Sequence, residues 1–230
     1  MPAGITDEIV KIAIMAVPIV IAITFHEAAH GYVARMFGDD TAARLGRITF
    51  NPLKHIDPFG TILLPALLLL SHAGFVFGYA KPVPVNFNRL NNPKRDMIWV
   101  AAAGPATNIA LAAASAVLLA IGLHASATPS EPLAELFLGS LQINLVLALL
   151  NLLPLPPLDG GRVVTGLLPH RLSAPYARIE PYGFFILIGA LFLLPVIGAK
   201  LGMDLDVFDW LIGRPVDWLM RATLQLIVGM

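Results

Sequence analysis

Four long stretches almost free of charge restrict this chain to the folds of membrane proteins. A helix needs about 20 mostly apolar residues to cross a bilayer. Segments of this kind occupy residues 9–36, 97–123, 133–153 and 182–199. Charged residues make up only 13% of the 230 residues, too few to cover a soluble surface, where roughly 25% is usual. The sequence therefore predicts an all-α polytopic membrane protein embedded in a lipid bilayer.

Two other segments are ambiguous. Residues 61–79 are long enough to cross but contain Pro65, His72 and Gly74. Residues 206–229 carry charged side chains at intervals of three to five residues, which places these charges on one face of a helix. This pattern is typical of an amphipathic helix that packs on the bundle or lies at the membrane surface.

The distribution of Lys and Arg predicts which loops face the cytoplasm. Basic residues occur in segments 37–60, 80–96 and 154–181, whereas residues 124–132 have none. By the positive-inside rule, the first three are cytoplasmic and the last is outside. Both flanks of 61–79 then lie on one side, which favours a re-entrant hairpin broken near Pro65 or Gly74. An ordinary transmembrane helix with one basic loop on the wrong side is the alternative.

The organisation of the chain follows from the same pattern. We expect one membrane-embedded domain over residues 1–230, with a core at 9–168 and C-terminal helices at 182–229. The N-terminus lacks the features of a removable signal peptide.

Residues 80–93 are rich in Pro and Asn with alternating apolar positions, so we expect an extended segment or a short strand pair. Basic and acidic residues are equal in number, 15 each, which argues against a nucleic-acid partner.

The end of the first apolar stretch carries the motif His26-Glu27-Ala28-Ala29-His30. On a helix, this spacing places two imidazoles on one face, where they can hold one Zn²⁺ with Glu27 beside a metal-bound water. The chain has no cysteine, so any metal must be bound by His, Asp or Glu. Ionisable groups inside a membrane segment are expensive and indicate a functional site.

A catalytic zinc usually has three protein ligands, so a third is needed. Asp159 is the best candidate, because it is the only acidic residue between Glu135 and Glu180. Prolines precede it and two glycines follow it, which predicts a carboxylate on an irregular turn. The alternative is that Asp159 only caps a short helix that runs to Leu168.

Together these motifs resemble the site-2 protease family of intramembrane zinc metallopeptidases. HEAAH near the end of an apolar helix and NLLPLPPLDGGR at the end of a later helix carry the resemblance. Further similar segments lie at residues 44–61, 77–86 and 101–108. No appended PDZ or CBS domain is expected, so the chain resembles a minimal bacterial-type member.

The resemblance implies a role for each residue that matches a family motif. His26, His30 and Asp159 correspond to the zinc ligands, for one Zn²⁺ per chain. Glu27 corresponds to the catalytic glutamate. Asn151 corresponds to the asparagine that helps to hold the substrate or stabilise the oxyanion.

The implied activity is zinc-dependent endoproteolysis within or near transmembrane segments of membrane proteins. Membrane-anchored regulators or signal-peptide remnants are the expected substrates. The expected location is a bacterial-type inner membrane, with the active site toward the cytoplasm; a homo-oligomer is left open. Two rival hypotheses are a catalytically silent zinc-binding membrane chaperone and a metal transporter.

Several other residues yield weaker predictions. The segment AKPVPVN, residues 80–86, could add an edge to an extended substrate. His55 could bind a second metal with Asp57, although an interfacial hydrogen-bonding role is favoured. Asn108 is expected to have a structural role, as a polar side chain that hydrogen-bonds between helices. Gly104-Pro105 predicts a kink or a close helix approach.

Overall fold

A computed structural model describes residues 3–70, 78–125 and 131–229 of the chain. No strand occurs in these residues, and most of them are helical, which confirms the all-α prediction. The helices are α1 (Ala3–Met36), α2 (Thr41–Arg44), α3 (Leu64–Leu70), α4 (Pro93–Ala125), α5 (Glu131–Leu152), α6 (Asp159–Leu167), α7 (His170–Ala177), α8 (Glu180–Ile188), α9 (Leu194–Leu201) and α10 (Arg214–Thr223). Short 3₁₀ or π-helical pieces are η1 (Pro52–Lys54), η2 (Pro58–Leu63), η3 (Phe87–Arg89), η4 (Gly189–Leu193), η5 (Asp209–Gly213) and η6 (Leu224–Val228).

Four helical stretches are long and apolar enough to cross a membrane. They cover Ile14–Met36, Pro93–Leu123, Pro132–Leu152 and Glu180–Leu201. The four spans expected from hydropathy are therefore confirmed, each within a few residues at either end. The loop predicted at 124–132 lies largely outside the described residues.

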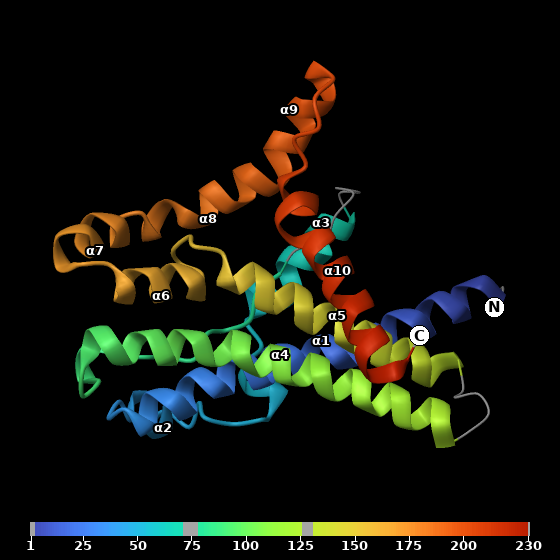
Figure 1. The fold of residues 1–230 in the computed structure, drawn as a ribbon, viewed down its shortest axis with the longest axis horizontal. Helices are drawn as coiled ribbons and strands as arrows, with labels where there is room; N and C mark the ends of the chain where they lie inside the picture. Colours follow the sequence, from blue (N-terminus) through green and yellow to red (C-terminus); the bar gives the residue numbers. More distant parts are fainter. Residues whose placement is uncertain (1–2, 71–77, 126–130, 230) are drawn as a thin grey trace.

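Helices α1, α4 and α5 lie side by side along the long axis of the molecule (Figure 1). Polar contacts fix their directions. His30 Nδ1 lies 2.7 Å from the carbonyl oxygen of Val100, and Asn108 Nδ2 lies 3.3 Å from that of Ala22, so α1 and α4 are antiparallel. Asn108 and Ser115 of α4 bond to Asn144 and Ser140 of α5, at 2.9 and 2.8 Å, so this pair is antiparallel too.

This arrangement bears on the ambiguous segment 61–79. Because α1 and α4 are antiparallel neighbours, Met36 and Pro93 lie at the same end of the bundle, and the chain between them must return to that end. The two ends of the segment also meet: the Tyr79 N–H donates to Gly60 O at 3.0 Å, and Thr61 Oγ1 donates to Tyr79 O at 2.9 Å. This geometry is what a re-entrant hairpin requires.

Of the two predicted break points, Pro65 does not interrupt the helix. Helical geometry continues from η2 through Leu64 into α3, and it changes from π-helical to α-helical just before Pro65. The other predicted break, Gly74, and His72 lie outside the described residues.

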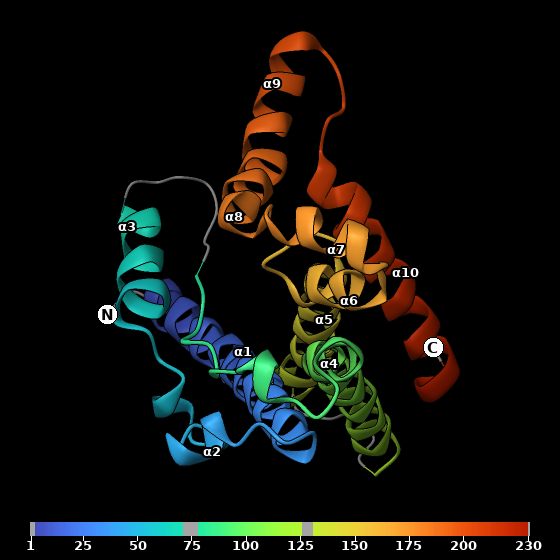
Figure 2. The same ribbon diagram turned by 90° about the vertical axis from the view of Figure 1, so that its left-hand side faces the viewer.

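Residues 78–86, which we call the strap, run in extended conformation back along α1 (Figure 2). Of the two predicted forms, the structure has the extended segment and not the strand pair, because Pro82 and Pro84 lack the N–H groups that a ladder needs. Contacts to the preceding loop hold the strap instead. The Lys81 N–H donates to His55 O at 2.9 Å, and Arg47 Nη2 donates to Lys81 O at 2.8 Å.

The C-terminal segment 206–229 packs on the bundle, one of the two predicted placements. Ile212 and Val216 are buried in a cluster with Leu141 and Leu145 of α5. Helices α8 and α9 instead project away from α4 and α5 (Figure 2). Their anchor is Gly183, whose missing Cβ would lie 1.5 Å from Pro156 O.

Candidate metal centre

The two predicted metal ligands on α1 are one turn apart and face the bundle interior. His30 lies six positions before Met36, about 9 Å from the end of the helix, and His26 lies one turn deeper. His26 and His30 are 7% and 9% exposed. Their Nε2 atoms are 3.1 Å apart, so both rings point to one position, as the HExxH spacing predicts.

Asp159 joins this pair from the opposite side of the bundle. Its Oδ2 lies 3.1 Å from His26 Nε2 and 3.3 Å from His30 Nε2. The prediction of an irregular turn is corrected: Asp159 is the first residue of α6, after a turn formed by residues 153–158. Leu158 occupies the N-cap, so the carboxylate is not used as a cap. The turn can pack closely because a Cβ on Gly160 or Gly161 would clash with its backbone.

The hydrogen bonds of the two histidines show which nitrogens face the metal position. His26 Nδ1 lies 2.6 Å from Asn108 Oδ1, and His30 Nδ1 lies 2.7 Å from Val100 O. Asn108 Nδ2 donates to Asn144 and Ala22, which leaves Asn108 Oδ1 as the acceptor. Both Nδ1 atoms therefore carry the proton, and both Nε2 atoms present lone pairs.

Three acceptors thus converge without a donor between them. Asp159 Oδ2 is buried and receives no hydrogen bond from the described residues. Buried acceptors in this arrangement need a positive partner between them, which a metal ion or a proton can supply. Of the residues that the structure describes, these three form the one cluster of His, Asp or Glu that could hold a metal.

The spacing of the cluster fits zinc. A tetrahedral Zn²⁺ with bonds of about 2.0–2.1 Å places its ligand atoms roughly 3.3 Å apart, and the three observed separations are 3.1, 3.1 and 3.3 Å. Gly104 of α4 keeps the space open, because a Cβ there would lie 2.5 Å from the Nε2 atoms of His26 and His30. The predicted close approach at Gly104 is confirmed, while α4 runs unbroken through Pro105.

Glu27 and Asn151 lie beside the triad. Glu27 Oε2 accepts a 2.7 Å hydrogen bond from the Val83 N–H of the strap. Asn151 Nδ2 donates to Leu147 O at 3.0 Å, which leaves its second amide proton for another acceptor. Both side chains line the same cavities as His26.

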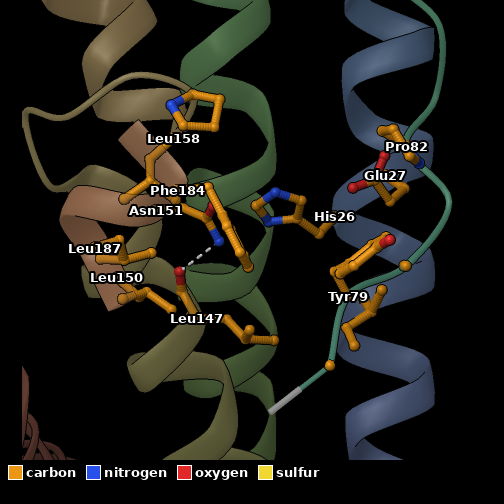
Figure 3. Close-up of a pocket in the computed structure, with 14 residues that line it drawn as sticks. His26, Glu27, Tyr79, Pro82, Leu147, Leu150, Asn151, Leu158, Phe184 and Leu187 are labelled. Atoms are coloured by element: carbon orange, nitrogen blue, oxygen red, sulfur yellow. Dashed lines mark hydrogen bonds between the residues drawn. The ribbon is translucent and has the colours of Figure 1, made fainter. Parts of the chain in front are cut away.

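Two cavities meet at these residues. The larger, about 550 Å³, is lined mainly by apolar side chains of α1, α5, α8 and the strap (Figure 3). The smaller, about 250 Å³, includes His30, Asp159 and Arg162. His26, Glu27 and Asn151 line both, so these three predicted site residues lie at the boundary between an apolar and a more polar space.

Other predicted candidates lie apart from the centre. His55 bonds through Nε2 to Thr49 O at 2.9 Å, and Asp57 caps η2, so the two do not form a second metal site. The Val83 N–H, expected to be available to a substrate, is engaged by Glu27.

Sequence reasoning underestimated Asn108 and missed Asn144. Asn108 orients a metal ligand directly, and Asn144 orients Asn108. The available signal was an asparagine within each of two apolar spans, where an unpaired amide would be costly.

Comparisons with known proteins agree with this chemistry. The family described as Peptidase family M50 matches residues 14–131 and 120–194. The "Putative zinc metalloprotease YwhC" of Bacillus subtilis is 43% identical over 79% of this chain and 81% of its own length. Rip2 of Mycolicibacterium smegmatis, which carries the same description, is 32% identical over 73% of this chain and 62% of its own length. Rip2 of Mycobacterium tuberculosis is 30% identical over 83% of this chain and 70% of its own length. No solved structure matches the chain.

Proposed function

Because this chain belongs to peptidase family M50 and is a zinc metalloprotease, we propose that it cleaves membrane proteins within or beside their transmembrane segments. One observation carries the proposal: His26 of the triad and Glu27 border an apolar cavity at the depth of candidate membrane spans. A substrate that reached this cavity through the bilayer would meet the reactive groups without entering water.

Each residue of the site has a separate role in the proposed peptide hydrolysis. His26, His30 and Asp159 would hold Zn²⁺, which polarises a carbonyl and lowers the pKa of a water molecule toward about 7. Glu27 takes the proton of the attacking water and delivers it to the leaving nitrogen. The strap N–H of Val83 orients this carboxylate through Oε2 and leaves Oε1 for the water.

Asn151 and Asn108 support the reaction in different ways. Asn151 lines both cavities, and its second amide proton is available there to donate to the developing oxyanion. Loss of such a donor typically costs on the order of 10²–10³ in rate. Asn108 does not touch the substrate but fixes the ring of His26.

We also propose that the centre faces the cytoplasm of a bacterial-type inner membrane. The end of the bundle that carries the triad also carries a concentration of basic residues. They are Arg35, Arg44, Arg47, Lys54, Lys81, Arg89, Lys94, Arg95, Arg162, Arg171 and Arg178. This bias supports a cytoplasmic location by the positive-inside rule. Membrane-anchored regulators and signal-peptide remnants would be accessible from there.

Cleavage of a model substrate by purified protein in liposomes tests the proposal. We expect wild type to hold one zinc and cleave a single-span peptide, Glu27→Gln to keep zinc but lose cleavage, and Asp159→Ala to lose zinc. A zinc-loaded wild type that cleaves no member of a substrate panel would contradict the proposal and leave a chaperone. Zinc flux that survives in Glu27→Gln would indicate a transporter instead.

A further inference from the structure

We propose that the strap and α8 form a selective pocket for a bulky apolar side chain of the substrate next to the scissile bond. This inference rests on the proposed function and names what the site selects. Tyr79 of the strap forms one wall, and Phe184 and Leu187 of α8 form the other (Figure 3).

The pocket is continuous with the reactive groups. The 550 Å³ cavity that these three side chains line also includes His26, Glu27 and Asn151. A peptide bond held at the boundary would therefore place the adjacent side chain inside the apolar cavity. The chain on the other side of that bond would enter the smaller cavity, which contains Asp159 and Arg162. Because the two cavities differ in polarity, an apolar side chain is selected on only one side of the scissile bond.

Backbone contacts hold both walls in register with the metal centre. The Tyr79 ring lies against Gly60, where an added Cβ would come within 2.4 Å of it, and the Tyr79 backbone bonds to Gly60 and Thr61. On the opposite wall, Gly183 lies directly against Pro156 O, in the turn that leads to Asp159. Phe184 follows this contact and Leu187 lies one turn later on α8. Walls fixed in this way can discriminate by size.

The volume of the pocket sets what it can hold. A helix with side chains is about 10–12 Å wide, so one turn fills roughly 400–600 Å³. The 550 Å³ cavity therefore has room for about as much chain as one helical turn, with a few side chains, and not for a whole transmembrane helix. Selection then acts on individual side chains, and removal of one methylene from a filled apolar pocket typically costs 10–200-fold in kcat/KM.

A size-swap experiment tests the assignment. Single-span peptides with Ala, Leu or Phe at each position flanking the cleaved bond are compared in liposomes. Wild type should prefer Leu or Phe over Ala by about tenfold or more on one side only. Leu187→Trp should fill the pocket and reverse this preference, whereas Phe184→Ala should enlarge it and favour Phe over Leu. Phe185→Trp is the matched control, because this neighbour is 73% exposed and lines neither cavity.

Crosslinking gives a readout that does not depend on turnover. A photoreactive residue at position 187 in Glu27→Gln protein should crosslink the intact peptide, and one at position 185 should not. Unchanged size preference in zinc-loaded, active Leu187→Trp and Phe184→Ala, or equal crosslinking at 185 and 187, would overturn the inference. Failure of wild type to cleave any peptide would instead count against the proposed function, so the two outcomes remain distinct.

Discussion

At the scale of single residues, the proposed zinc ligands depend on groups outside the triad. The Nδ1 proton of His26 is donated to Asn108 Oδ1 at 2.6 Å, and this bond aims Nε2 at the triad. Asn108→Ala should leave that proton unpaired in a buried site and let the ring turn. Mutation of such outer partners typically costs 10–100-fold in metal affinity. Zinc affinity measured by chelator competition checks this, with Ser115→Ala, farther along the same polar network, as a control that should bind zinc as wild type does.

Gly104 offers a steric test of the same centre. A Cβ at this position would lie 2.5 Å from the Nε2 atoms of His26 and His30, in the space that the metal needs. We expect Gly104→Ala to lose most bound zinc while the protein remains folded, because alanine favours a helix over glycine by about 1 kcal/mol. Gly189→Ala, where an added Cβ meets nothing within 4 Å, is the control for the general effect of replacing a helical glycine by alanine. Stoichiometric zinc in Gly104→Ala, measured by mass spectrometry, would contradict this account of the site.

How far the site was predictable is clearest at this scale. The spacing of His26 and His30 and the isolation of Asp159 in a Pro- and Gly-rich turn were enough to predict the triad. The roles of Asn108 and Val83 were not predictable, because their partners lie 82 and 56 residues away in the chain. A local pattern carries spacing within one element, whereas these bonds depend on how α1, α4 and the strap pack together.

At the scale of elements, the strap depends on a buried aspartate beyond the end of α1. Asp39 Oδ2 accepts a 2.6 Å bond from the Asn86 N–H, and Oδ1 accepts from the backbone and hydroxyl of Thr41. Burial alone would raise the pKa of Asp39, but these donors outweigh it and hold the pKa below its ordinary value. The strap therefore docks against an ionised carboxylate.

The sign of the pH dependence follows from this shift. Release of the strap removes the Asn86 N–H from the carboxylate, so the pKa of Asp39 would rise toward its ordinary value. The contribution of this bond to docking is therefore complete above the ordinary pKa and declines as pH falls through the lowered pKa. Hydrogen exchange of the strap amides, corrected for intrinsic rate, should not change between pH 5 and 8. Asp39→Asn should raise exchange at Asn86 by about tenfold, since a bond to a charged group contributes roughly 1.5–3 kcal/mol. Asp40→Asn, the adjacent and more exposed carboxylate, should not; equal exchange in both variants would refute the role of Asp39.

Helix α8 is held by a contact that leaves no room for a side chain. Gly183→Ala would bring a Cβ to 1.5 Å from Pro156 O and must push α8 away from the turn before Asp159. Because a shift of about 1 Å near a reactive site can cost on the order of 10² in rate, we expect cleavage to fall by about that factor. Zinc content should fall much less, since no ligand lies on α8. Loss of zinc in parallel with activity would show that α8 supports the metal centre itself.

At the scale of the whole molecule, hydropathy predicted the four spans but not how they are joined. The loop charges predicted a re-entrant 61–79, and the packing supplies an independent reason. An odd number of crossings between Met36 and Pro93 would make α1 and α4 parallel, yet His30 pairs with Val100 while Asn108 pairs with Ala22. Of the two forms expected for residues 80–93, the strand pair is absent for a local reason, because alternating prolines remove the donors of a ladder.

Membrane topology is therefore the prediction that tests the whole arrangement. The chain has no cysteine, so single-cysteine variants can be labelled without background. We expect Lys54→Cys and Asn88→Cys, on either side of the hairpin, to be protected from an impermeant maleimide added outside spheroplasts. Met203→Cys, in the exposed turn after α9, should be labelled, because Glu180–Leu201 is long enough to cross. Labelling of positions 54 and 88 from opposite sides would be incompatible with antiparallel α1 and α4. Labelling of both from outside, with 203 protected, would keep the hairpin but invert the proposed orientation and place the metal centre on the outer side.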